Sequence, residues 1–230
     1  MELHYAKFQL LQVRGNFDIR KPDGALIEPS DSMVYLGSTI YADGGAHNEL
    51  PRKIGTAWAD FCKLARVWKH AQILRKSKIE AFQAMVVGRL LYGLSTAWMN
   101  VAQVRRLNGF QARCLRTVMG IPHSFYSRVS NATVLERAGQ KPLGRHLLKQ
   151  QMLLYGRIAR APASDLLRNL TFVPGTQSPA TSRYIRRVGR PRNEWTVMLQ
   201  KESFKMSTEA DRMQHQPMEW RRAVERYCLN

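Results

Sequence analysis

Acidic residues are scarce in this sequence: only 17 of its 230 residues are Asp or Glu, against 36 Lys or Arg, and the formal net charge is +19. The deficit is greatest between residues 81 and 193, where 18 basic residues accompany only Glu136 and Asp165. One basic stretch with balanced flanks is typical of a protein that meets a polyanion. The charge pattern therefore predicts a nucleic acid as the partner. An anionic membrane is less favoured, because no membrane-facing aromatic stripe accompanies the arginines.

Cysteines and long apolar runs are also few. Cys62, Cys114 and Cys228 lie far apart, so the sequence indicates neither a disulfide framework nor a zinc motif, and we expect buried, inert thiols. No apolar run is long enough to cross a membrane, and the N-terminus lacks the pattern of a secretory signal. We therefore expect an intracellular protein, in the nucleus or the cytoplasm, that is neither secreted nor membrane-spanning.

Motifs for bond-making chemistry are missing from the sequence. It has no Gly-rich phosphate loop, no nucleophile elbow and no histidine pair at i, i+4 spacing. Tyr41-Ala42-Asp43 is similar to the start of the Tyr-Ala-Asp-Asp box of some reverse transcriptases, but Gly44 follows it. A nucleotidyl transferase needs at least two carboxylates for its two metal ions, and the nearest acids to Asp43 are Asp31 and Glu49. We predict no catalytic residue and no metal ligand here, and we interpret Asp43 as a turn former.

Residues 1–45 have strand and turn character. Pro22-Asp23-Gly24 is a turn signature, and the runs 9–15 and 25–29 on either side suit short strands. The segment 33–41 also suits a strand, which Asp43-Gly44-Gly45 would end. The predicted fold class is mainly α with a small N-terminal antiparallel β element (α+β), in which a β-hairpin or strands precede a helical bundle.

From about residue 48 the apolar period changes from two to 3.6 residues, which predicts helices. The predicted helices cover 48–70, 74–99, 102–119 and 142–161, with a short one within 128–139 and one or two more around 193–203 and 217–228. Gly120 would close the third helix. Ser130 or Asn131 would be the N-cap of the short helix, and Gly139 its C-terminal stop. The Pro, Ser, Thr and Gly content of 162–182 predicts a loop or linker.

Two of the predicted helices have a basic face opposite an apolar one. On a helical wheel of 102–119 the basic face comprises Arg105, Arg106, Arg113 and Arg116. Most basic faces are only solvated, but they usually mix in acids for i, i+4 pairs, and this helix has none. The face is therefore predicted to contact phosphates. The basic face of 142–161 comprises Arg145, Lys149, Arg157 and Arg160.

Five segments in a fixed order carry a family resemblance. They are VYLGSTI (34–40) followed by Asp43-Gly44, LLYGLSTAW (90–98), RCLRTVMGI (113–121), RVSNATVLERAG (128–139) and GRPRNEW (189–195). With these motifs in this order, the chain resembles the downstream part of a non-LTR (LINE-type) retrotransposon endonuclease-reverse transcriptase, an RNA-directed DNA polymerase. Residues 201–230 match no motif of the family.

The resemblance implies a domain order. Residues 1–45 would be a residual palm edge, with a primer-grip-like hairpin at Tyr35, Leu36 and Gly37 that in the family holds the 3′ end of the growing strand. Residues 46–161 would be a helical thumb along the minor groove of the template–primer duplex. Residues 162–192 would be a basic loop or linker, and residues 193–230 short C-terminal helices.

The resemblance also implies a partner and a limit on activity. The expected partner is an RNA or DNA duplex, bound through its phosphates without sequence specificity, and no membrane or small-molecule substrate is expected. In the family, the catalytic Asp-Asp box and its Mg²⁺ site precede the Tyr-Leu-Gly strand. They would lie before residue 1, so we expect a fragment that has no cofactor and no polymerase activity of its own.

The full set of predicted nucleic-acid-binding residues joins both helix faces to the later basic segment. It comprises Arg105, Arg106, Arg113, Arg116, Arg145, Lys149, Arg157, Arg160, Arg186, Arg187, Arg190 and Arg192.

Two alternative functions stay open. Residues 189–192, GRPR, are similar to the core of an AT-hook, which suits a stand-alone protein that binds A·T-rich minor grooves. The second alternative is that the chain is a retroelement relic without function.

Overall fold

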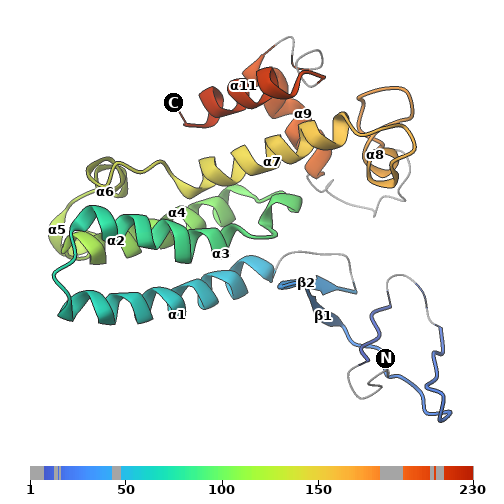
Figure 1. Cartoon of the computed structure of the whole chain (residues 1–230), viewed down its shortest axis with the longest axis horizontal. Helices are drawn as coiled ribbons and strands as arrows, with labels where there is room; N and C mark the ends of the chain where they lie inside the picture. The colour runs from blue at the N-terminus through green and yellow to red at the C-terminus, as the bar shows by residue number, and fades with distance from the viewer. Residues whose placement is uncertain are drawn as a thin grey trace. The chain divides into compact units, whose positions relative to one another are not determined.

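The structure is a computed structural model that describes residues 8–12, 15, 17–42, 48–181, 194–207, 210 and 215–229. It is mainly helical, with one two-stranded antiparallel sheet near the N-terminus (Figure 1), and this confirms the predicted fold class. The chain divides into two compact units, Met1–Thr56 and Ala57–Asn230. In this division, α1 (Glu49–His70) runs through the boundary and the helices after residue 193 belong to the second unit. The predicted domain order stays a prediction.

The first unit contains a β-hairpin of β1 (Ser32–Tyr35) and β2 (Ser38–Tyr41). Leu36 and Gly37 form its two-residue turn, with φ values of 47° and 78°. Positive φ at both central positions is typical of a type I′ turn, whose twist matches that of the paired strands. The β-hairpin expected at Tyr35, Leu36 and Gly37 is therefore present, whereas the expectation of one continuous strand over 33–41 is wrong, because the chain reverses at Leu36-Gly37.

The predicted turn at Pro22-Asp23-Gly24 is confirmed. The amide of Gly24 donates to the carbonyl of Lys21 (2.9 Å), and Gly24 has a φ of 85°. The predicted strands on either side are not formed in the described part of 8–29. That part contributes isolated bridges instead, between Leu10 and Pro29 and between Arg20 and Leu26.

The second unit is built from helices. After α1 come α2 (Arg75–Ala81), the π-helical η2 (Phe82–Val87), α3 (Gly88–Leu91), the 3-10 turn η3 (Leu94–Thr96), α4 (Val101–Met119), α5 (Ser124–Ser127), α6 (Asn131–Arg137), α7 (Leu143–Ala159), α8 (Leu166–Thr171), α9 (Trp195–Met206) and α11 (Pro217–Leu229). Within this unit, α7 lies between the group of α2, α3 and α4 and the C-terminal helix α11 (Figure 1).

The sequence periodicity predicts most of these helices well, and two expectations are wrong. The predicted helix over 74–99 ends at Leu91, because Gly93 takes a positive φ of 75° and turns the chain into η3. The predicted loop over 162–182 contains α8, which is capped by the side chain of Asp165 accepting from the amide of Arg168 (2.9 Å). Phe172, directly after α8, is 1% exposed and belongs to the core.

The core of the second unit is rich in aromatic side chains. Phe61 of α1 packs edge-on against Phe82 of η2, with ring centroids 5.9 Å apart. A second cluster surrounds α7, where Tyr155 packs against Phe172 (5.4 Å) and Trp220 of α11 is fully buried. These contacts place α7 at the centre of the unit and join the C-terminal helices to it.

Side chains of α4 cap the beginning of α7. The amide of Leu143 donates to Gln111 Oε1 (2.9 Å), and the amide of Gly144 donates to Asn108 Oδ1 (2.8 Å). The first amides of a helix have no partner within the helix, so these two bonds satisfy groups that would otherwise be orphaned. Gly144 has no room for a side chain, because an added Cβ would lie 2.7 Å from Val104. The register between α4 and α7 is therefore fixed by both hydrogen bonds and close packing.

Two of the three cysteines fit the predicted inert thiols. Cys114 and Cys228 are buried, and burial raises the pKa of both thiols, that of Cys228 to about 11. A thiol with a raised pKa carries little thiolate near neutral pH, so it is a poor nucleophile. Cys62 is half-buried.

Among the described residues, no helix is both long and apolar enough to cross a membrane.

Candidate nucleic-acid interface

Helix α4 presents an outward arc of arginines. Its first turn is fixed by a capping box, in which the amide of Gln103 donates to Asn100 Oδ1 and the amide of Asn100 to Gln103 Oε1, both at 2.9 Å. Arg105 and Arg106 are exposed and make no ion pair within the described part of the chain. The sequence from 81 to 135 contains no Asp or Glu. The arc is therefore a rigid cationic surface without neighbouring acids along that stretch.

Arg113 belongs to the same arc and lies on an aromatic ring. Its guanidinium carbon is 4.0 Å from the centroid of the Trp58 ring, and Trp58 stacks against Phe61 at 5.6 Å. A guanidinium on a ring face keeps its N–H groups available at the edge. The stack fixes the side chain of Arg113 without removing its ability to contact a phosphate.

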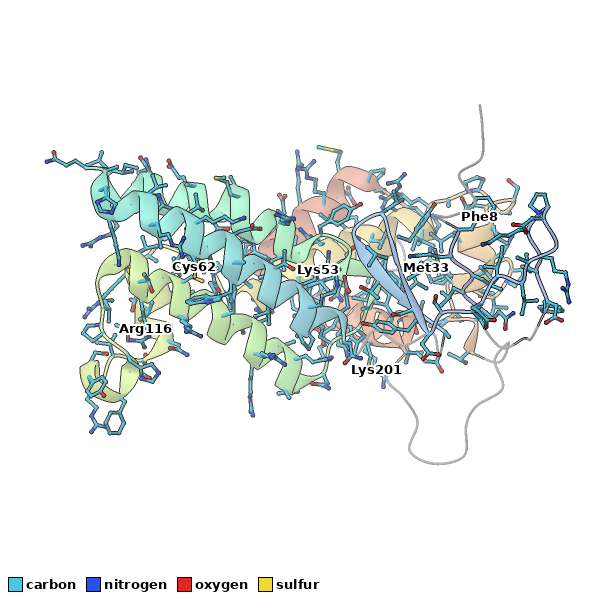
Figure 2. The ribbon with its side chains drawn as sticks, turned by 90° about the horizontal axis from the view of Figure 1, so that it is seen from below. Phe8, Met33, Lys53, Cys62, Arg116 and Lys201 are labelled. Atoms are coloured by element: carbon cyan, nitrogen blue, oxygen red, sulfur yellow. The ribbon has the colours of Figure 1, made fainter. Side chains whose placement is uncertain are left out.

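The prediction that Arg116 belongs to the exposed face is wrong. Its side chain is 6% exposed and lies where the end of α4 meets the following loop (Figure 2). One terminal nitrogen donates to Pro122 O (3.2 Å) and Ser127 Oγ (3.3 Å). The other donates to Val129 O (2.6 Å) and Asn131 Oδ1 (3.1 Å). Because these donors are committed to the loop, Arg116 is a structural residue and not a phosphate ligand.

The predicted basic face of α7 is mixed. Arg145 and Arg157 are exposed, and Arg145 lies 5.7 Å from the centroid of the Tyr227 ring. Lys149 forms an ion pair with Glu225 (2.9 Å), which holds the pKa of that carboxyl below its usual range. Arg160 is half-buried, and burial lowers its pKa. Arg145 and Arg157 are therefore the members of this face best placed to contact phosphate.

Several predicted residues lie outside the described part of the chain. They are Asp43, Gly44, Gly45, Arg186, Arg187, Arg190 and Arg192. The AT-hook-like segment at 189–192 therefore stays a prediction, and so does the turn at 43–45.

The primer-grip-like residues lie at the tip of the hairpin in the first unit. Tyr35 and Leu36 are 56% and 72% exposed. The carbonyl of Gly37 accepts hydrogen bonds from Arg52 (2.9 Å) and Lys53 (3.2 Å) at the beginning of α1. The turn is therefore attached to the helix by two cations, while its apolar side chains face solvent.

Glu49 connects these two cations to the hairpin. Its carboxylate accepts from Arg52 Nε (2.9 Å) and from the amide of Thr39 (3.3 Å), and it forms an ion pair with Lys53 (3.7 Å). Burial raises the pKa of Glu49, but the hydrogen bonds from Arg52 and Thr39 outweigh this effect and the pKa is lowered overall. The ionised carboxylate thus stabilises the attachment of the hairpin to α1.

Replacing Glu49 with Gln should lower the free energy of unfolding by about 1–3 kcal/mol near neutral pH, because it removes a buried hydrogen-bonded charge. The pKa of Glu49 is lower in the folded chain than in the unfolded chain. Its contribution to stability is therefore complete at pH values above the ordinary pKa of a glutamate, and it is lost as the pH falls through the folded pKa. Chemical denaturation over a pH series should therefore show the difference between the two proteins shrinking in acid. The control, Glu136→Gln at an exposed position on α6, should give a small difference at every pH; a constant large difference at Glu49 would refute the linkage.

Sequence reasoning missed one exposed feature of the second unit. Phe125 and Tyr126 of α5 are 66% and 78% exposed, and their ring centroids are 5.3 Å apart at 87°. The available signal was two adjacent aromatic residues in an otherwise polar segment after Gly120-Ile121-Pro122.

Among the described residues there is no group of three or more His, Cys, Asp or Glu side chains that could hold a metal ion.

Comparisons with known proteins add no family or fold assignment. Neither the scan against family models nor the searches of curated proteins and solved structures find a match to this chain.

Proposed function

We propose that the chain is the thumb-side part of a LINE-type reverse transcriptase, and that it binds a nucleic-acid duplex through phosphate contacts without sequence specificity and without polymerising by itself. The observation that carries the proposal is the outward arc of α4, where Arg105, Arg106 and Arg113 are exposed in a stretch free of acids. The ordered sequence motifs support the assignment to this family.

The chemistry of the arc suits a phosphate backbone better than base edges. Cations that replace condensed counterions gain free energy from counterion release, and this gain is independent of sequence. A guanidinium matches two phosphate oxygens at once, and α4 holds its arginines on a capped helix packed against α7. Arg145 and Arg157 are exposed on α7 and would extend the cationic surface.

A duplex-binding assay over a salt series tests the proposal. The logarithm of the affinity for a DNA or RNA–DNA duplex should fall linearly with the logarithm of salt concentration. Arg105→Gln/Arg106→Gln should weaken binding and reduce the slope by about 1–2, since each lost phosphate contact removes about 0.9. Fluorescence anisotropy with a labelled duplex measures both quantities, and A·T-rich and G·C-rich duplexes should bind equally.

The matched control removes the same net charge elsewhere in the second unit. Lys63 and Arg89 both pair with Asp60, at 3.9 Å and 2.8 Å. Lys63→Gln/Arg89→Gln should therefore reduce the slope less than the α4 variant does. Equal effects would mean that net charge, and not the α4 arc, controls binding. Salt-insensitive binding, or primer extension by the chain alone, would contradict the proposal.

A further inference from the structure

The loop between α4 and α6, which contains α5, lies at one end of the second unit, the end opposite α8 (Figure 1). Phe125 and Tyr126 project from α5 and are both well over half exposed. Single exposed apolar residues are common on protein surfaces. Two adjacent large rings in contact with each other, on a short loop, form a distinct surface feature.

The loop is fixed at both ends by Arg116. The four hydrogen bonds of this guanidinium reach from Pro122, before α5, to Asn131, at the beginning of α6. Within the loop, the amides of Tyr126 and Ser127 both donate to the carbonyl of His123 (3.0 Å). The backbone that carries the rings is therefore ordered before any partner arrives, so binding costs little additional entropy.

The residue after α5 is held in an uncommon conformation. Arg128 has a φ of 55°, in the left-handed region that non-glycine residues rarely adopt, and its amide donates to the carbonyl of Ser124 (3.0 Å). This conformation leaves its guanidinium carbon 5.4 Å from the centroid of the Phe125 ring. One arginine and two rings are thus gathered on a loop in the acid-free stretch 81–135.

We infer that Phe125, Tyr126 and Arg128 form a stacking site for an unpaired nucleobase next to a duplex. Every base has a π-face that can stack on an aromatic ring, and proteins that bind single strands combine such rings with cations for the phosphates. Here Tyr126 offers an open ring, Phe125 supports it, and Arg128 supplies the positive charge. The inference deepens the proposed function and rests on it, because the α4 arc would hold the adjoining duplex.

The charge around the rings favours an anionic ligand over a neutral or basic protein surface. The nearest acid along the chain is Glu136, and Arg128 is the charged residue closest in sequence to the rings. A backbone phosphate beside a stacked base would meet Arg128, and no carboxylate in the acid-free stretch would repel it. An anionic membrane could also bind two aromatic rings and an arginine, and binding to anionic vesicles distinguishes it from a nucleic acid.

Binding should be compared between a blunt duplex and the same duplex with a short single-stranded overhang. The intact chain should prefer the overhang, and Phe125→Ala/Tyr126→Ala should reduce affinity for it by about tenfold or more, since stacking contributes about 1–3 kcal/mol per base. Affinity for the blunt duplex should not change. A fluorescent adenine analogue at the first unpaired position should be quenched by the intact chain and not by the variant.

Two further variants separate stacking from other effects. Phe125→Leu/Tyr126→Leu keeps apolar side chains without π-faces, so it should behave like the alanine variant; retention of the overhang preference would overturn the stacking site. Phe204→Ala, at an exposed phenylalanine on α9, should leave the preference intact. Because both rings are exposed, thermal melting should show that all variants stay folded.

The outcomes distinguish this inference from the proposed function. Failure to bind the blunt duplex contradicts the proposed function. Binding of the blunt duplex without a preference for the overhang, or with a preference that survives Phe125→Ala/Tyr126→Ala, overturns the stacking site alone. Binding of anionic vesicles that is lost in this variant, without any overhang preference, would assign the rings to a membrane surface and also overturn the inference.

Discussion

Replacing Arg116 with methionine should lower the free energy of unfolding by about 2–4 kcal/mol. Methionine keeps the buried aliphatic stem of the side chain but removes all four hydrogen bonds to the loop. The four acceptors would lose a charged donor, and a hydrogen bond to a charged group contributes about 1.5–3 kcal/mol. Water that binds some of the freed acceptors offsets part of this loss. Chemical denaturation measures the change.

The matched control for this substitution is Arg105→Met on the same helix. Arg105 is exposed and makes no ion pair in the described part of the chain, so its loss should change stability by less than about 0.5 kcal/mol. Arg116→Lys should be nearly as damaging as Arg116→Met, because an ammonium cannot reach four divergent acceptors. Hydrogen exchange should show the amides of Tyr126 and Ser127 losing protection. Equal stability of the Arg105 and Arg116 variants would show that the four hydrogen bonds of Arg116 do not stabilise the fold.

The error at Arg116 shows what a helical wheel omits. The wheel places Arg116 beside Arg105 on the side away from the core, and the structure agrees for Arg105, Arg106 and Arg113. The difference at Arg116 comes from the loop after Gly120, which covers the last turn of α4 and supplies carbonyl acceptors there. A local periodicity contains no information about a later segment that folds back over the helix.

The hairpin shows a second limit of sequence reasoning. Alternating residues over 33–41 predict extended structure, and both strands are indeed extended. The turn itself lies at Leu36-Gly37, where a leucine takes a positive φ that its side chain disfavours. Gly37 suits such a position but Leu36 does not, so the local pattern alone does not show the reversal, and only the family resemblance predicts a hairpin here. The two hydrogen bonds that Arg52 and Lys53 donate to Gly37 O help to stabilise it.

The helices were predictable because each buries one continuous apolar stripe, as in α1 and α4. The contacts that position them were not predictable, since they join residues distant in the sequence. Asn108 and Gln111 cap α7 from α4, and Trp195 of α9 donates to the carbonyl of Ser95 (2.8 Å). The exposed pair Phe125-Tyr126 belongs to the same category, because the loop that carries it is held by hydrogen bonds from Arg116 of α4.

Replacing Gly156 with alanine should destabilise the chain by about 1–3 kcal/mol, although alanine is the better helix former. An added Cβ at this position in α7 would lie 2.2 Å from Nε1 of Trp220, which is fully buried. The indole would have to move, and its Nε1 donates a hydrogen bond to the carbonyl of Met152 (3.0 Å). Overpacking and the weakened hydrogen bond together outweigh the propensity gain of about 1 kcal/mol.

Gly109→Ala in α4 is the matched control, because an added Cβ there meets no atom within 4 Å. It should stabilise the chain by about 0.5–1 kcal/mol, so the same chemical change should have opposite signs in the two helices. Trp220→Phe tests the cause: it should cost much less in the Gly156→Ala background than alone, because the smaller ring relieves the clash. Additive effects of the two substitutions would mean that α7 and α11 do not meet through this pair. A coupling between them would identify the Gly156–Trp220 approach as a contact that holds α11 in the second unit.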